Sequence, residues 1–346
     1  MGYRAVVRSR RFWILVLLSL AAVAFFAWQQ DFGEMGRAFA QAQPAYIGGA
    51  VGAYFLSLWA RAIRWRMLLS HLRDTGDWNA FHALAVGTMV NNLLPARMGL
   101  VARAHLLGRR ARIHRAAVGG SLFAEALFDG LMILALVGLA LGAVRVGGTL
   151  QLLALVLAGG LSAFLLLALL IAYRNARLQR AVAPLLHRLP PAMAAAFRRT
   201  GSHAADGMGT FRCPFRIGRV VGMSGLSWGL MGVAYFLLGT AFNLPLNYVD
   251  YLVIAGVANL AVTLPLLAGG MGAFELATFQ ILSALGVGQP DAGAYVVALH
   301  ALLIVPIVVV GLLLLGAEGR QPRFSTLLSA RLLAGRFVGL PQPLNP

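Results

Sequence analysis

Amide and cationic side chains interrupt an apolar stretch of this chain, and their types and spacing indicate what they could bind. The sequence NNLLPARMG, residues 91–99, places Asn91, Asn92 and Arg97 around Pro95. Proline removes a backbone donor and leaves carbonyl groups without partners, and neighbouring asparagine amides can bond them. The planar guanidinium of Arg97 can hold a phosphate through two parallel hydrogen bonds. Together these residues predict a polar site for an anion.

A second interrupted stretch, NLAVTLPLLAGGMGAFE, begins at Asn259 and has the same features. Both stretches carry asparagine before Leu-Pro and then Met-Gly. Gly270 and Gly272 give the backbone conformational freedom at this second break. Glu275 can cap a helix that begins at Gly272, or it can take part in proton coupling. We therefore expect the two breaks to contribute to one site.

Further charged residues lie within apolar runs, where each costs on the order of 3 kcal/mol and is therefore expected to be functional or paired. Glu125 and Asp129 are four residues apart and share one helix face. We expect Arg97 or Arg103 to pair with one of these acids, which leaves an arginine for an anionic headgroup. The alternative is a purely structural ion-pair network. His300 is predicted to be a packed histidine with one hydrogen bond.

Motifs of soluble catalysis are absent from the sequence. There is no Gly-Lys-Ser/Thr phosphate loop, no cysteine and histidine spacing for a metal, and no nucleophile beside a base. The single cysteine, Cys213, excludes an internal disulfide. We expect no catalytic residue, no metal and no cofactor.

The composition indicates which elements must position these residues. Of 346 residues, 60% are hydrophobic and 12% are charged, and the mean hydropathy is +0.78. A soluble chain of this length needs a polar surface that such a composition cannot supply. Several runs approach the roughly 20 residues that a bilayer crossing requires. The clearest are residues 12–28, 44–59, 118–144, 152–173, 220–242 and 292–316. The pattern predicts an all-α, polytopic membrane protein.

The basic residues are all arginine, and they outnumber the acids 29 to 11, which gives a formal net charge of +18. They cluster between apolar runs rather than on a polar domain, so anionic membrane lipids are the expected partner and nucleic acid is not. Self-association and contact with separate lipid-synthesis enzymes are left open. The positive-inside rule places the arginine-rich segments in the cytoplasm. These are residues 1–11, 61–73, 109–115, 174–219 and the tail 317–346, predicted to be amphipathic.

The loop 29–43 is then outside, and both termini are on the cytoplasmic side of the inner membrane. Residues 80–107 start and end inside, whereas 251–287 start and end outside. We predict that each is a re-entrant broken hairpin, beside about six full transmembrane helices; full crossings are the alternative. The order helix, helix, hairpin, helix fills residues 1–145 and, inverted, 151–316. Residues 1–346 are thus expected to form one integral membrane domain.

Matched breaks in two inverted halves are typical of the central site of a transporter. Hydrocarbon cannot satisfy the backbone groups that proline and glycine free, so such breaks persist where they are buried or line a wet cavity. The alternative is that Pro95 and Pro265 are tolerated kinks and that the asparagines only hold helices together. The predicted substrate-binding residues are Asn91, Asn92, Pro95, Arg97, Arg103, Glu125, Asp129, Asn259, Gly270, Gly272 and Glu275.

Several of these motifs carry a resemblance to a known family. They are RAIRWRMLL, NNLLPARMGLVARAHLL, the two acids of AEALFD, and LPLLAGGMGAFE followed by LGV and a last apolar run. With them the chain resembles the flippase-like membrane region of lysylphosphatidylglycerol synthases over about residues 10–316. Two positions depart from that pattern, because Leu100 stands for a glutamate and Ala126 for an arginine.

The resemblance implies movement of an amphipathic anionic or glycosylated lipid between leaflets of the cytoplasmic membrane. Bifunctional members append a soluble aminoacyl-transferase domain after the membrane part, and we expect that activity to be absent here, so the chain is expected to be a transporter and not an enzyme. Two alternatives stay open. One is an intramembrane enzyme that uses Glu125 or Asp129 as a base on a lipid headgroup. The other is a non-transporting scaffold of a lipid-synthesis complex.

Overall fold

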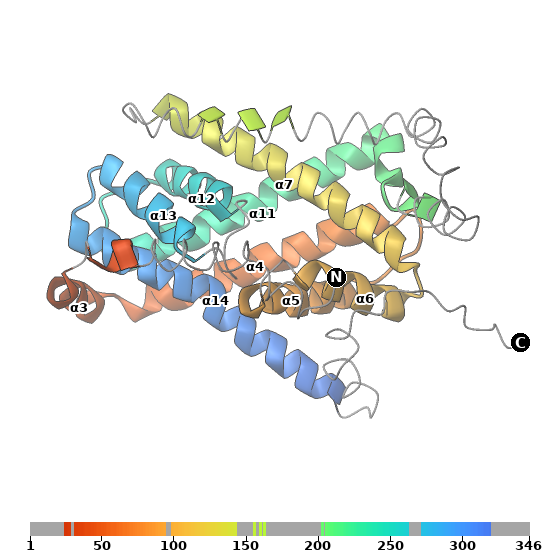
Figure 1. The fold of residues 1–346 in the computed structure, drawn as a ribbon, viewed down its shortest axis with the longest axis horizontal. Helices are drawn as coiled ribbons and strands as arrows, with labels where there is room; N and C mark the ends of the chain where they lie inside the picture. The colour runs from red at the N-terminus through yellow and green to blue at the C-terminus, as the bar shows by residue number, and fades with distance from the viewer. Residues whose placement is uncertain are drawn as a thin grey trace, which may run out of the picture.

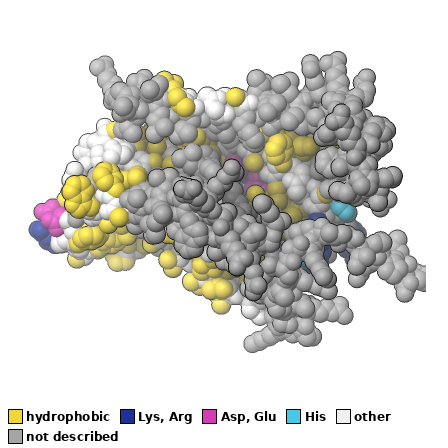
Figure 2. Space-filling view, viewed as in Figure 1, with side chains coloured by type: hydrophobic (Ala, Val, Ile, Leu, Met, Phe, Trp, Pro, Cys, Tyr) yellow, Lys and Arg dark blue, Asp and Glu magenta, His cyan; other side chains and the backbone are white. Residues whose placement is uncertain are grey.

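The computed structural model describes residues 24–28, 31–94, 98–143, 155–156, 159–160, 162–163, 202–203, 205–262 and 271–319. Within these ranges the secondary structure is helical and contains no strand, which confirms the predicted all-α membrane protein. Three described helices are long and apolar enough to cross a membrane, over Arg115–Leu139, Phe215–Ala241 and Gln289–Ala317. Figure 2 shows hydrophobic side chains over much of the described part of the visible face, as expected for a protein surrounded by lipid.

Two long helices, α4 (Pro44–Leu69) and α11 (Pro214–Ala241), pack along one another through the middle of the molecule (Figure 1). Each has proline at its start, where the missing N–H is not needed. The hydroxyl of Ser57 donates to the carbonyl of Ser227 at 2.7 Å and joins the two helices. The sequence predicted that the first of them ends near residue 59. It instead runs to Leu69 and has 26 residues, about 39 Å, because Arg64 finds acidic partners inside the protein.

Helices α5 (Asp77–Leu93) and α6 (Met98–Ala111) form an antiparallel pair. The backbone N–H of Gly99 donates to Oδ1 of Asn91 at 2.8 Å, so the asparagine bonds a backbone group next to the break, as predicted. Gly87 lies against Arg103, and a Cβ at Gly87 would lie 2.2 Å from Cγ of that arginine. Glycine is therefore required for this close approach. The pair has the shape of the hairpin predicted for residues 80–107, and its entry into a membrane stays a prediction.

Helices α12 (Tyr248–Val262) and α13 (Ala273–Ala284) also pack together; α12 precedes the second break in the chain and α13 follows it. Gly272 has φ +89°, a conformation that L side chains rarely adopt, and directly precedes α13. In Figure 1 the α5–α6 pair and the α12–α13 pair lie towards opposite ends of the long axis.

Helices α7 (Arg115–Ala143) and α14 (Gln289–Gly319) complete the framework, α7 across α12 and α14 along α5. Close approaches again use glycine, since Gly256 of α12 meets Leu136 and Gly311 of α14 meets Met89. A short turn of 3-10 helix, η1 (Gly209–Arg212), precedes α11.

Residues 29–43 were predicted to be a loop, and that prediction is wrong, because they contain the helix α3 (Phe32–Gln41). The carboxylate of Asp31 accepts from the N–H groups of Gly33 and Glu34 at 2.9 and 3.1 Å and caps this helix. Most of the predicted spans 12–28 and 152–173, and all but the first residues of the tail 317–346, lie outside the described residues. The inverted repeat therefore stays a prediction.

Candidate functional site

A partly open cavity of about 180 Å³ lies where α4, α5, α6, α7, α11, α12, α13 and α14 meet. This volume is several times the ~30 Å³ that one water occupies in the liquid. The lining contains both arginines and amides, which is unusual among apolar helices. Its polar members are Tyr54, Arg61, Thr88, Asn92, Arg103, Glu125, Tyr235, Asn259 and His300.

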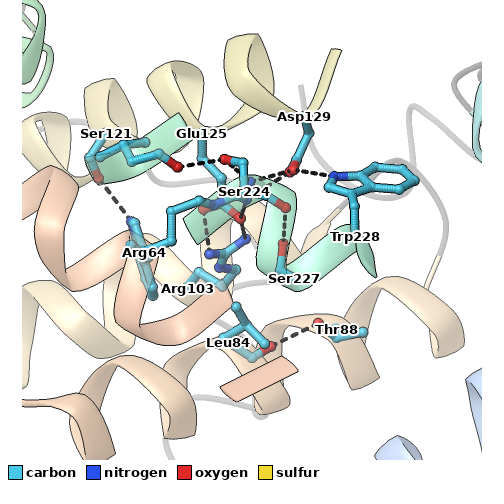
Figure 3. Close-up of polar contacts among 12 residues, drawn as sticks. Arg64, Leu84, Thr88, Arg103, Ser121, Glu125, Asp129, Ser224, Ser227 and Trp228 are labelled. Carbon is cyan, nitrogen blue, oxygen red and sulfur yellow. Dashed lines mark hydrogen bonds and ion pairs between the residues drawn. The ribbon is translucent and has the colours of Figure 1, made fainter. Parts of the chain in front are cut away.

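Glu125 of α7 forms one wall of the cavity and is held by two arginines (Figure 3). Nη2 of Arg103 lies 2.7 Å from Oε2 of Glu125, and Nη2 of Arg64 lies 3.5 Å from Oε1. The guanidinium of Arg103 also lies over the ring of Trp65, 4.2 Å from its centroid. The predicted pairing of Arg103 with Glu125 is confirmed.

Asp129, one turn further along α7, is held by an arginine that the sequence did not indicate. Both of its oxygens accept from Arg64, at 2.6 and 3.0 Å, and Oδ1 also accepts from Nε1 of Trp228 at 3.3 Å. Arg64 is fully buried and donates as well to the hydroxyl of Ser224 at 3.1 Å. The sequence placed Arg64 in a loop between apolar runs, and this was wrong, because it lies inside α4; the cytoplasmic side of this segment stays a prediction. Asp129 is not among the residues that line the cavity.

Arg61, one turn before Arg64 on α4, lines the cavity without an acidic partner in the described part of the chain. Its Nε and Nη2 atoms are buried and have no hydrogen-bond partner among those residues. Its Cζ lies 5.4 Å from the ring centroid of Trp228, which gives the cation a partial partner. Sequence reasoning missed this residue. The spacing of three between Arg61 and Arg64, within a run that continues apolar on both sides, was the available signal.

The predicted asparagines divide into two groups. Asn92 of α5 and Asn259 of α12 both line the cavity, although they come from different helix pairs. Nδ2 of Asn259 donates to the carbonyl of Ala255 at 2.8 Å within its own helix. Asn91 does not line the cavity and instead accepts the hydrogen bond from Gly99.

Glu275 and His300 form a pair at the edge of the cavity. Oε2 of Glu275 accepts from the N–H of Gly272 at 2.6 Å, as predicted for a cap of α13. Oε1 of Glu275 contacts Nδ1 of His300, which confirms the single hydrogen bond predicted for that histidine. A carboxylate only accepts, so Nδ1 carries the proton and a neutral ring keeps its lone pair on Nε2. Sequence reasoning missed that His300 also lines the cavity.

Three predicted site residues, Pro95, Arg97 and Gly270, lie outside the described residues, so their place in the site stays a prediction. Across the described ranges, no group of three or more histidines, cysteines and acids is arranged to hold a metal ion.

The geometry can be compared with known proteins. A family model described as the lysylphosphatidylglycerol synthase TM region matches residues 12–311. The chain belongs to this family. The match runs through both breaks and through α7, which carries the two acids, so the resemblance of the motifs is confirmed.

A curated relative of this lysylphosphatidylglycerol synthase family member is Glycosyltransferase AglD of Haloferax volcanii. The two are 32% identical over 149 residues, which cover 42% of this chain and 24% of that protein. The matched part thus spans about a quarter of the relative. No solved structure matches the chain.

Proposed function

We propose that the chain binds the headgroup of an anionic or glycosylated amphipathic lipid in the central cavity and moves that lipid between the leaflets of the cytoplasmic membrane. Family membership supports a role connected with membrane lipids. The observation that carries the proposal is the guanidinium of Arg61, which faces the cavity with two buried nitrogens that lack hydrogen-bond partners in the described part of the chain.

A buried guanidinium without an anion is costly, because it has lost water and gained no equivalent partner. A phosphate oxygen pair would supply two charge-assisted hydrogen bonds to Arg61 in the fork geometry that arginine favours. Arg103 is less free to do this because Glu125 already holds it. Asn92, Asn259 and the other polar groups of the lining can bond the hydroxyl groups of a polyol or sugar.

The placement of this site between two helix pairs supports movement of the lipid between leaflets. The α5–α6 and α12–α13 pairs lie towards opposite ends of the long axis and both contribute to the cavity (Figure 1). We propose that they enter the membrane from opposite faces and that small shifts of one against the other expose the headgroup site to each leaflet in turn. The arginine-rich segments 1–11, 61–73, 109–115, 174–219 and 317–346, which include both termini, are then on the cytoplasmic side.

Reconstitution of the full chain into vesicles tests this function. A fluorescent phosphatidylglycerol in the inner leaflet is protected from a membrane-impermeant quencher until it is moved outward. We expect the unaltered protein to accelerate its exposure, and Arg61→Gln to slow it about tenfold or more, because hydrogen bonds to a charged group are worth about 1.5–3 kcal/mol.

Arg109→Gln is the matched control, because Arg109 is exposed near the end of α6 and does not line the cavity. This variant should behave like the unaltered protein. Equal rates for Arg61→Gln and the unaltered protein, at equal thermal stability, would remove Arg61 from the substrate site.

An intramembrane lipid-modifying enzyme is the second candidate, favoured by the name of the relative and by Nε2 of His300 in the cavity. Glu125 and Asp129 are poor bases here, because arginines hold them. Mass spectrometry of the lipid distinguishes the two. The lipid is weighed before and after incubation with the protein, first without and then with an added nucleotide-sugar donor. An enzyme changes the mass of the lipid and a transporter does not. A scaffold would change neither mass nor leaflet.

A further inference from the structure

We propose that the cavity takes up one proton together with a singly charged, phosphodiester-type anion, and that Nε2 of His300 carries this proton. The inference rests on the proposed function for the lipid headgroup as ligand, and it adds a charge and a stoichiometry. Two observations carry it. One is the balance of charges around the cavity, and the other is Nε2 of His300, which has no hydrogen-bond partner among the described residues.

The charged side chains around the cavity balance one another among the residues that the structure describes. Three arginines and three carboxylates lie in the cavity lining or directly behind it. Arg61, Arg103 and Glu125 line the cavity. Arg64 contacts Glu125 and holds Asp129 behind the lining, and Glu275 contacts His300 of the lining. Ion pairs account for two members of each set. The remaining charges are the cation of Arg61 and the anion of Glu275, which is bonded to Gly272 and His300 rather than to an arginine.

An anion bound to Arg61 adds one negative charge to this neutral set. In a partly open cavity lined by apolar helices the surplus charge is expensive, because the surroundings screen it less well than water does. Uptake of one cation removes the surplus. A proton on a group beside the cavity is the simplest source, since the described residues offer no arrangement for a metal ion.

His300 has the acceptor that this step requires. Nδ1 donates to Glu275, and Nε2 is buried and has no hydrogen-bond partner within the described ranges. Protonation forms one N–H bond at Nε2 with a proton from water, and no other bond of the protein breaks. The resulting imidazolium then has the carboxylate of Glu275 on one side and the bound anion across the cavity.

Other groups that face His300 from neighbouring helices are less suited to take the proton near neutral pH. From α4 these are Arg61 and Tyr54, from α11 Tyr235, from α13 Glu275, and across the cavity Arg103 with Glu125. Arginines and tyrosines already carry their protons in this range. Both carboxylate oxygens of Glu125 are contacted by guanidinium groups, so neither is free in the way that Nε2 of His300 is. On α3, which packs on α14, Glu34 and Arg37 pair at the exposed surface.

Calorimetry of the purified full chain tests the proton. Dihexanoyl phosphatidylglycerol is a suitable probe, because a phosphodiester keeps one charge near neutral pH and any proton taken up belongs to the protein. Titration in two buffers of different ionisation enthalpy gives the number of protons bound. We expect about one proton per lipid bound and, as uptake of one proton requires, an affinity that falls about tenfold per pH unit as the pH rises.

His300→Gln should bind the probe more weakly, take up no proton and lose the pH dependence. His114→Gln is the matched control, because His114 directly precedes α7 and does not line the cavity. This variant should keep the proton uptake and the pH dependence. Binding by the unaltered protein without proton uptake would overturn the inference and leave the anion site intact. Proton uptake that persists in His300→Gln would also overturn it. No binding by the unaltered protein would contradict the proposed function and this inference together.

Discussion

Neighbouring arginines on α4 differ in what they bond. Arg64 is expected to stabilise the fold, and Arg61 is proposed to bind the lipid. Arg64 is fully buried and holds Asp129 and Glu125, so its charge is compensated inside the protein. Arg61, one turn away, faces the cavity without an acidic partner among the described residues. Removal of Arg64 leaves the partly buried Asp129 without its ion-pair partner, whereas removal of Arg61 breaks no ion pair among the described residues. The two residues should therefore fail in different measurements.

Arg64→Leu is predicted to destabilise the protein by about 3 kcal/mol, because it leaves the partly buried carboxylate of Asp129 without its cation. The measurement is the thermal unfolding midpoint in detergent. Adding Asp129→Leu should restore much of the loss, since the orphaned charge is then removed as well. A single Arg64→Leu protein as stable as the unaltered one would contradict the role assigned to this pair.

Arg66→Leu is the control for that prediction. Arg66 is partly exposed and pairs with Asp74 and Asp77 beyond the end of α4, where hydrogen bonds from Arg66 and Gly76 lower the pKa of Asp74 to about 2. Exposed pairs contribute about 0–1 kcal/mol, so this variant should change the midpoint little.

At the scale of elements, the two helix pairs beside the breaks position the site. The sequence predicted the α5–α6 pair because proline and glycine interrupt an apolar run, and it predicted that Arg97 or Arg103 pairs with Glu125 or Asp129, of which the structure shows Arg103 with Glu125. It missed the length of α4, because a rule that counts arginines near helix ends assigns Arg61 and Arg64 to a loop. Burial of Arg64 depends on acids 61 and 65 residues away in the chain, which a local pattern cannot reveal.

Gly87→Ala is predicted to destabilise the α5–α6 pair by about 1–3 kcal/mol, because the new Cβ would overlap the stem of Arg103. The unfolding midpoint in detergent is again the measurement. Gly119→Ala in α7 is the control, since a Cβ there has nothing within 4 Å, and it should leave the midpoint unchanged or raise it. Equal midpoints for the two variants would contradict the close packing of α5 on α6.

At the scale of the whole molecule, the arginine-rich segments are predicted to be cytoplasmic, among them residues 174–219. The chain has one cysteine, Cys213, which is partly exposed between η1 and α11. A membrane-impermeant maleimide should label it in inside-out vesicles and leave it unlabelled in right-side-out vesicles. Ser283→Cys in a Cys213→Ser background should show the opposite pattern, because Ser283 is exposed near the end of α13, within residues 251–287 that are predicted to start and end outside. The same pattern for both positions would overturn the predicted topology.

The central claim is that the cavity holds an anionic headgroup through Arg61. Native mass spectrometry of the protein purified in mild detergent tests it directly, because it weighs the lipid that stays bound. We predict that the unaltered protein and Arg109→Gln retain one anionic phospholipid per chain, and that Arg61→Gln loses it while remaining folded. Retention of the same lipid at the same occupancy by Arg61→Gln would contradict the claim.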